Sequence, residues 1–166
     1  TAAEFLRYLE SLGNPDKKAW SAKILNTRLD VLVVGTKVMQ KIARDIFNGN
    51  YRDFLALEIF ENYETIAVYG LIISKIKDFK EFKKYLNIYS NVIENWAHCD
   101  LLQFNINSDN IDDFLNLSAG YLKSEKVFVR RLGLFILFTL IKDEKYLGYA
   151  FNALINLKNE KEYYVN

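Results

Sequence analysis

LGLFILFTLI at residues 132–141 and IAVYGLII at residues 66–73 are apolar on every side. A helix of this kind has no face to offer to water, so each run is expected to lie at the centre of the protein with other helices around it. The longer run is too short to span a bilayer, and Arg131 and Lys142 flank it. The sequence therefore predicts buried helices inside a packed protein and no membrane partner.

Amphipathic segments alternate with these apolar runs. In residues 79–89, for example, Phe79, Phe82 and Leu86 oppose a lysine-rich face. The alternation recurs about every 35–40 residues, which is typical of stacked helix pairs, because one pair cannot bury its own apolar face. We therefore expect an all-α fold, a right-handed superhelical stack of antiparallel helix pairs that forms an α-α solenoid. The expected pairs are 52–61 with 64–77, 79–89 with 90–97, 109–122 with 125–141, and 143–157 with a helix that starts near Glu160.

Composition excludes several classes of protein. The chain has 166 residues, of which 51% are hydrophobic and 26% are charged, so it is expected to fold around a core. One Pro and 7 Gly argue against a β-sandwich, and VLVV at residues 31–34, which has no partner strand, is interpreted as a buried connection. A single cysteine, Cys99, and a single histidine, His98, exclude an internal disulfide and a Cys- or His-based metal cluster. With no visible signal peptide, these features predict a cytoplasmic protein without a metal or cofactor.

Positive charge is concentrated in two segments, although the whole chain has a net charge of only +1. Residues 15–44 contain seven Lys and Arg against two acids, and residues 123–145 contain six against three. Residues 94–116 contain five acids and no Lys or Arg. Two basic stretches on one concave face would suit a polyanion such as DNA, while the alternative is that these charges only solvate helix faces. The candidate DNA-binding residues of the first stretch are Lys23, Lys37 and Lys41.

The segment ENWAHCD at residues 94–100 carries the pattern that is most informative about chemistry. Trp96 and Asp100 are four residues apart, so on a helix they share one face. An indole offers its negative ring face and a carboxylate offers a full charge, so the two together can hold a cation. The alternative interpretation makes Trp96 a core anchor and Asp100 the N-cap of a helix that starts at Leu101.

A second pattern, FVRRLG at residues 128–133, places Arg130 and Arg131 in the first turns of a helix that is otherwise apolar. A guanidinium beside the positive end of a helix forms a site for a phosphate or a carboxylate. The alternative is an arginine that extends from the buried helix to water, or one that pairs with an acid such as Asp100.

Together these two patterns resemble the DNA alkylation repair (AlkD-like) family. The resemblance covers nearly the whole chain and implies a single HEAT-like helical repeat domain over residues 1–166, truncated at its C-terminus. It also implies an enzyme, a DNA glycosylase that acts on N3- and N7-alkylated purines. Three weaker segments agree in order: GTKVMQKIA at residues 35–43, Tyr63-Glu64 leading to GLII at residues 70–73, and KEYYV at residues 161–165.

The resemblance implies a role for each residue in the two patterns. Asp100 would stabilise positive charge on the sugar and position the attacking water, while Trp96 would pack against the deoxyribose or backbone of the lesion nucleotide. Arg131 would contact a backbone phosphate, with Arg130 as the second candidate of the pair. The implied partner is duplex DNA that contains alkylated bases, bound by a monomer. Two alternatives stay open: a non-catalytic DNA-binding module and a protein-interaction scaffold.

Overall fold

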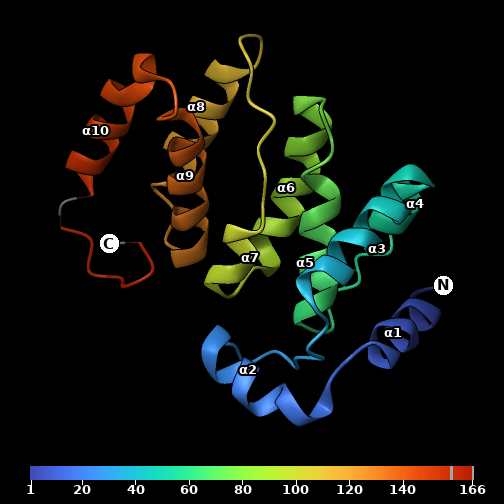
Figure 1. Ribbon diagram of the computed structural model, residues 1–166. Coiled ribbons are helices and arrows are strands. Elements are labelled where there is room, and N and C mark those ends of the chain that lie inside the picture. The colour runs from blue at the N-terminus through green and yellow to red at the C-terminus, as the bar shows by residue number, and fades with distance from the viewer. Residues whose placement is uncertain (158, 166) are drawn as a thin grey trace. The chain divides into compact units, whose positions relative to one another are not determined.

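A computed structural model gives the structure of residues 1–157 and 159–165 (Figure 1). Contacts between residues divide the chain into two units, Thr1–Gln103 and Phe104–Asn166, and each unit buries its own apolar side chains. In the described part of the chain every regular element is a helix, and the β-type contact found there is an isolated parallel bridge between Asp30 and Asn62. The predicted all-α fold built from helical repeats is therefore confirmed.

Side-chain caps fix where several helices begin. Asn62, Asp78 and Asn95 each accept a hydrogen bond from a backbone N–H in the first turn of the helix that follows. The elements of the first unit are α1 (Ala2–Ser11), the 3₁₀ helix η1 (Pro15–Lys17), α2 (Lys18–Leu25), α3 (Thr36–Asn48), α4 (Tyr51–Leu55), α5 (Tyr63–Ile73), α6 (Phe79–Val92) and α7 (Trp96–Asp100). The elements of the second unit are α8 (Ile111–Tyr121), α9 (Val127–Leu140), the 3₁₀ helix η2 (Glu144–Tyr146) and α10 (Leu147–Asn156).

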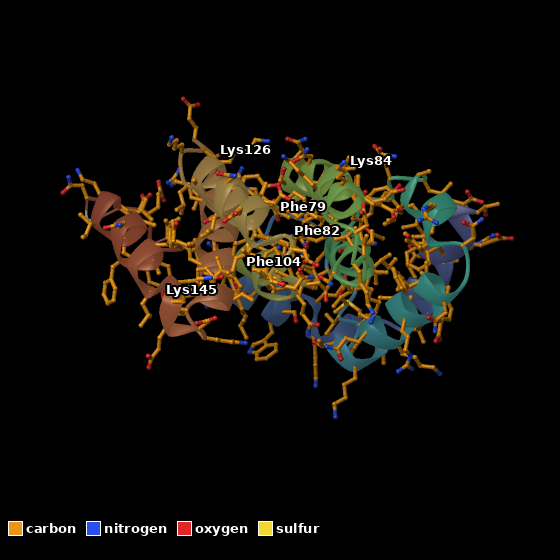
Figure 2. The ribbon with its side chains drawn as sticks, turned by 90° about the horizontal axis from the view of Figure 1, so that it is seen from above. Phe79, Phe82, Lys84, Phe104, Lys126 and Lys145 are labelled. Carbon is orange, nitrogen blue, oxygen red and sulfur yellow. The ribbon has the colours of Figure 1, made fainter. Side chains whose placement is uncertain are left out.

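Helix α5 forms the centre of the first unit. Nine of its 11 residues are buried, and α3, α6 and α7 pack directly against it. On α6, Phe82 points into the unit and is 2% exposed, whereas Lys84 is exposed to solvent (Figure 2). The expectation for residues 66–73, a central helix that other helices cover on several sides, is confirmed.

The linker between α2 and α3 is held by few backbone bonds, in which Asp30 O accepts from the Tyr63 N–H and Leu32 O accepts from the Asn14 N–H. The buried carboxylate of Glu64 binds the N–H groups of the same stretch. Its oxygens accept hydrogen bonds from the N–H groups of Leu32, Val33 and Val34 at 2.9, 2.6 and 3.2 Å. Val33 has a φ of 65°, a left-handed conformation that costs a β-branched residue about 1–3 kcal/mol. The bonds to Glu64 hold this conformation, so residues 31–34 form the expected buried connection and lead directly into α3.

Helices α8 and α9 form a closely packed hairpin in the second unit. A Cβ atom at Gly133 would lie 3.0 Å from the Leu122 side chain and 3.1 Å from the Ser118 carbonyl oxygen, so glycine lets the two helices approach. The buried Ser118 hydroxyl donates to the Gly133 carbonyl at 2.8 Å. The apolar run at residues 132–141 lies mostly inside the unit, as expected, although Phe138 is 50% exposed. No helix of the described residues combines the length and the apolar character needed to cross a membrane.

Two expected helices are wrong, and a third, expected over residues 52–61, ends early because α4 stops at Leu55. The helix expected over residues 90–97 is wrong, because α6 runs past its start and the N-cap Asn95 opens α7 instead. The helix expected near Glu160 is also wrong: residues 159–165 contain turns and no helix, and the Glu160 side chain is bound to α9. In these two places a single polar side chain, Asn95 or Glu160, sets the local structure through its hydrogen bonds. The spacing of apolar residues does not predict such bonds.

Candidate functional site

Helix α7 presents Trp96 and Asp100 on one face. The helix has five residues, and these two are its first and last. Two residues of an α-helix turn through about 200°, so His98, midway between them, lies on the opposite face. His98 is fully buried, whereas Trp96 and Asp100 are both partly exposed. Asp100 therefore ends a helix instead of capping one that starts at Leu101, and Trp96 is not a fully buried core anchor.

Hydrogen bonds around His98 fix the buried side of α7. Asn95 caps the helix by accepting the His98 N–H on Oδ1 at 3.1 Å, and its Nδ2 donates to His98 Nδ1 at 3.1 Å. On the other side of the ring, Nε2 donates to the Tyr63 carbonyl oxygen at 3.2 Å. The Tyr89 hydroxyl donates to the His98 carbonyl at 2.8 Å, and the Tyr63 ring stacks on the imidazole with 4.8 Å between centroids. These contacts tie α7 to both α5 and α6.

The same partners define the protonation state of His98. A carbonyl oxygen can only accept, so Nε2 carries the proton and Nδ1 accepts from the Asn95 amide. Burial favours this neutral form and lowers the pKa of His98 to about 4. Burial also raises the pKa of Tyr63 to about 12 and the pKa of Tyr89 well above its usual value. The imidazole and the two phenols behind α7 are therefore uncharged near neutral pH.

The start of α7 is joined to the end of α2. The Trp96 indole Nε1 donates a long hydrogen bond of 3.4 Å to the carbonyl oxygen of Ile24. Glu94, just before α7, accepts hydrogen bonds from the Thr27 hydroxyl and, at 3.2 Å, from the Arg28 N–H. The Glu94 carboxylate therefore anchors the chain after α2, and its charge is used within the fold.

A basic hollow of about 370 Å³ adjoins the end of α7 in the first unit. Its wall includes Leu101, the residue after Asp100, and no carboxylate is among the described residues that line it. Four cations gathered around one hollow create a positive potential that attracts phosphate groups, although the Asp45 carboxylate lies 3.8 Å from Arg44 Nε. The cationic side chains of this basic hollow are Lys37, Lys41 and Arg44 from α3 and Lys75 from the segment after α5.

The basic hollow includes two of the three lysines expected to bind DNA in the first unit, Lys37 and Lys41. Lys23 is exposed on α2 and is not part of its wall. Sequence reasoning missed Arg44 and Lys75 as site residues. Helical spacing could have found Arg44, because positions 37, 41 and 44 lie on one helix face. Lys75 gives no such signal, since only the packing of α5 against α3 brings it to the hollow.

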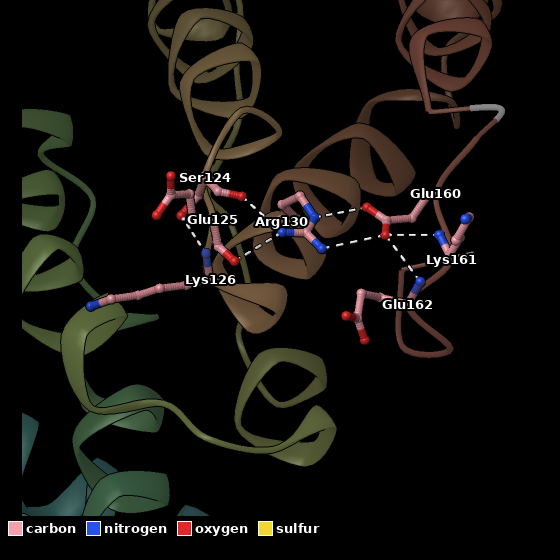
Figure 3. Close-up of polar contacts among 7 residues, drawn as sticks. All are labelled: Ser124, Glu125, Lys126, Arg130, Glu160, Lys161 and Glu162. Atoms are coloured by element: carbon pink, nitrogen blue, oxygen red, sulfur yellow. Dashed lines mark hydrogen bonds and ion pairs between the residues drawn. The ribbon is translucent and has the colours of Figure 1, made fainter.

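Arg130 on α9 is bound within the second unit (Figure 3). Its Nε and Nη2 donate to the two carboxylate oxygens of Glu160 at 2.8 and 3.3 Å. Its Nη1 donates to the carbonyl oxygens of Ser124 and Glu125 at 2.9 and 3.1 Å. The paired side chains are only 14% and 12% exposed. This geometry gives Arg130 a structural role in holding residues 159–165 to α9, and the DNA contact expected of it stays a prediction.

Arg131, the next residue of α9, is partly exposed. Its Nη1 donates to the Tyr164 carbonyl oxygen at 2.9 Å, and its Cζ lies 5.4 Å from the centroid of the Phe135 ring, a cation–π contact. Arg131 belongs to the second unit, whereas Trp96 and Asp100 belong to the first. The phosphate contact expected of Arg131 stays a prediction.

The arrangement in the first unit favours one kind of substrate. A carboxylate and an indole share the exposed face of α7, and the basic hollow begins at the residue after that carboxylate. Such a site suits a ligand that carries phosphates and develops positive charge near Asp100. Within the described residues, no group of three His, Cys, Asp or Glu side chains is arranged to hold a metal ion.

The chain matches a protein-family model over almost its whole length. The family is described as DNA alkylation repair enzyme, and the match covers residues 5–166. No curated protein and no solved structure gave a significant match to the chain. The matched region contains α7, the basic hollow and α9.

Proposed function

The chain belongs to the family of DNA alkylation repair enzymes, and from that premise we propose that it is a monomeric DNA glycosylase. It hydrolyses the N-glycosidic bond of N3- and N7-alkylated purines in duplex DNA, with Asp100, Trp96 and Arg131 as its catalytic residues. The observation that carries this proposal is the position of Asp100, which lies at the partly exposed end of α7, on the face of Trp96 and directly before Leu101, a residue that lines the basic hollow.

The reaction breaks the bond between C1′ of the deoxyribose and the purine nitrogen. Alkylation at N3 or N7 gives the base a formal positive charge, so the base takes the bonding electron pair and leaves as a neutral molecule. The sugar becomes an oxocarbenium-like cation, and water then adds to C1′ and releases a proton. The Asp100 carboxylate stabilises this cation and orients the water by accepting its hydrogen bond. Because the leaving group is already activated, no acid is needed to protonate it.

The other residues of the proposal hold the DNA. Trp96 packs its indole against the deoxyribose of the lesion nucleotide, and Arg131 contacts a backbone phosphate. The four cations of the basic hollow bind further phosphates, a favourable contact because it releases counterions from the DNA whatever the sequence. Lys23, which is exposed on α2, is a further candidate for such a contact.

Release of 7-methylguanine or 3-methyladenine from methylated duplex DNA tests the proposal. The wild-type protein is expected to release the free base, and Asp100→Asn to slow single-turnover release by about 1,000-fold. A carboxylate about 4 Å from the developing cation contributes about 4 kcal/mol at an effective dielectric constant near 20, which is about three decades in rate. Asp113→Asn is the matched control, because Asp113 is an exposed carboxylate on α8, and it is expected to keep the full rate.

Three results would count against the proposal. Full activity of Asp100→Asn would remove this carboxylate from the mechanism. Salt-dependent duplex binding by the wild-type protein without base release would leave a non-catalytic DNA-binding module, which the basic hollow alone is enough to support. Absence of DNA binding even at low salt would leave a protein-interaction scaffold.

A further inference from the structure

His98 connects the exposed face of α7 to the core of the first unit. Its ring bonds α5 through the Tyr63 carbonyl and the N-cap through Asn95, and its own carbonyl accepts from Tyr89 on α6. Trp96 and Asp100 lie two residues to either side on the opposite face, so a rotation that moves His98 moves both of them. We propose that His98 is the positioning residue that aims Trp96 and Asp100 at the lesion nucleotide, an inference that rests on the proposed function.

A helix as short as α7 depends on such anchors for its orientation. Isolated helices of fewer than about 12 residues are marginal in water, so the five residues of α7 take their geometry from the contacts around them. Behind the helix the contacts are close: a Cβ atom at Gly70 would lie 2.6 Å from the Tyr89 hydroxyl oxygen and 2.9 Å from Leu101 Cδ1. This close packing leaves little room for α7 to rotate or shift against α5 and α6.

The neutral imidazole is suited to this position because one rigid ring both accepts and donates. Nδ1 accepts from Asn95 while Nε2 donates to Tyr63, so the ring spans the distance between the N-cap and α5. Leucine would fill the space but would leave the Asn95 amide and the Tyr63 carbonyl without these bonds, and buried polar groups shift to recover hydrogen-bond partners. Glutamine keeps a donor near Nε2, and asparagine keeps an acceptor near Nδ1.

The test uses three substitutions of His98 in a Trp20→Phe background. The chain has 2 Trp, so this background makes Trp96 the only source of indole fluorescence and lets its emission report on α7. His98→Leu is expected to slow single-turnover base release by about 10- to 100-fold, since a displacement near 1 Å costs that much at a reacting centre. The Trp96 emission is expected to shift and its quenching by acrylamide to rise. His98→Gln and His98→Asn are expected to recover part of both signals.

Two controls separate positioning from general loss of stability. The Kd for an undamaged duplex is expected to stay unchanged in every His98 variant, because none of the cations proposed to bind phosphate lies on α7. Leu9→Ala removes a fully buried side chain of α1 and lowers stability without a change at α7. At a temperature where it is folded, this control is expected to keep the wild-type release rate and the wild-type Trp96 emission.

The outcomes distinguish failure of this inference from failure of the proposed function. A folded His98→Leu protein with the wild-type release rate and emission would overturn the positioning role. If the wild-type protein releases no base, the proposed function fails, and the Trp96 emission of His98→Leu still decides whether His98 orients α7. If His98→Leu does not fold, wild-type release and emission in both His98→Gln and His98→Asn would overturn the inference.

Discussion

Protonation of His98 is unfavourable because both ring nitrogens already have partners. A proton on Nδ1 would face the amide N–H group of Asn95, and turning that amide to offer its oxygen would remove the N-cap bond to the His98 N–H. The titratable groups that face the ring are Tyr63 from α5, Tyr89 from α6 and Glu94 from the segment before α7. Burial lowers the pKa of His98 to about 4 and outweighs the hydrogen bond to the Tyr63 carbonyl and the Glu94 charge, which both favour the protonated form.

This lowered pKa of His98 predicts that stability depends on pH. In the unfolded chain the imidazole binds a proton as the pH falls below 6.5, whereas in the folded protein it does so only near pH 4. The unfolded state therefore gains protons first, and the free energy of unfolding is expected to fall by up to about 3 kcal/mol between pH 6.5 and 4. Urea denaturation across this range measures the effect, with His98→Gln as the variant that lacks the titrating group. A wild-type curve parallel to that of the variant would contradict the prediction.

Single residues could be predicted where their role is local. The four-residue spacing of Trp96 and Asp100 was enough to place them on one face of a helix, because helical periodicity relates near neighbours. The role of His98 could not be read in the same way, since its ring bonds a carbonyl 35 residues away. Likewise Arg130 is a plausible phosphate ligand in sequence, but its partner in the fold, Glu160, lies 30 residues further on.

At the scale of the helix, α5 lies very close to its neighbours at Gly70. The hydroxyl of Tyr89 occupies the space that a side chain would need there, and this hydroxyl bonds the His98 carbonyl. The backbone of Gly70 is helical, with no positive φ, so the glycine is required for the space it leaves and not for its conformational freedom. Helix α5 is apolar on every side, but the absence of a side chain at Gly70 leaves room for the Tyr89 hydroxyl that bonds the His98 carbonyl.

Gly70→Ala is expected to destabilise the protein although alanine is the better helix former. Alanine gains up to about 1 kcal/mol inside a helix, but overpacking costs about 1–3 kcal/mol. Gly120→Ala on α8 is the matched control, because no heavy atom lies within 4 Å of a Cβ atom placed there, and it is expected to stabilise the protein. Thermal unfolding of the two variants measures the difference. Equal stabilisation by both would mean that Tyr89 moves aside at no cost.

Helices could be predicted better at their centres than at their ends. The apolar runs at residues 66–73 and 132–141 lie inside α5 and α9, because burying them is the main gain of folding. The ends are set by single polar groups that periodicity does not report. Asn95 starts α7 where a longer helix was expected, and the Glu160 carboxylate binds Arg130 where a further helix was expected.

At the scale of the whole molecule, positive and negative charges nearly cancel, but several positive charges are concentrated around the basic hollow. With a net charge of +1, DNA affinity depends on local phosphate contacts such as those of the basic hollow. The double variant Lys37→Gln/Lys41→Gln is expected to reduce the slope of log K against log salt by about 0.9 for each phosphate that the protein no longer neutralises. Titrating duplex DNA at several salt concentrations measures this slope. Lys80→Gln, at an exposed position of α6 outside the hollow, is the control, and an equal change in both variants would contradict the prediction.

Fold class could be predicted for the whole chain, and the family resemblance with it. The alternation of apolar and amphipathic segments is a property of the entire sequence, so it survives errors at individual boundaries. The basic hollow could be predicted only in part. Lys37 and Lys41 share a helix face in sequence, but Lys75 joins them through the packing of α5 on α3. That residues 1–166 form a single domain stays a prediction.

The hydrogen bonds from the linker before α3 to Glu64 also decide which substitutions residues 32–34 tolerate. A carboxylate that accepts main-chain N–H groups cannot distinguish the side chains of residues 32–34. These positions can therefore vary as far as burial allows while the anchor persists, and proline is the exception because it has no N–H to give. The backbone path that leads into α3, the helix of Lys37 and Lys41, therefore depends on Glu64, a residue about 30 positions downstream. The side chains of the linker are less constrained than this one glutamate.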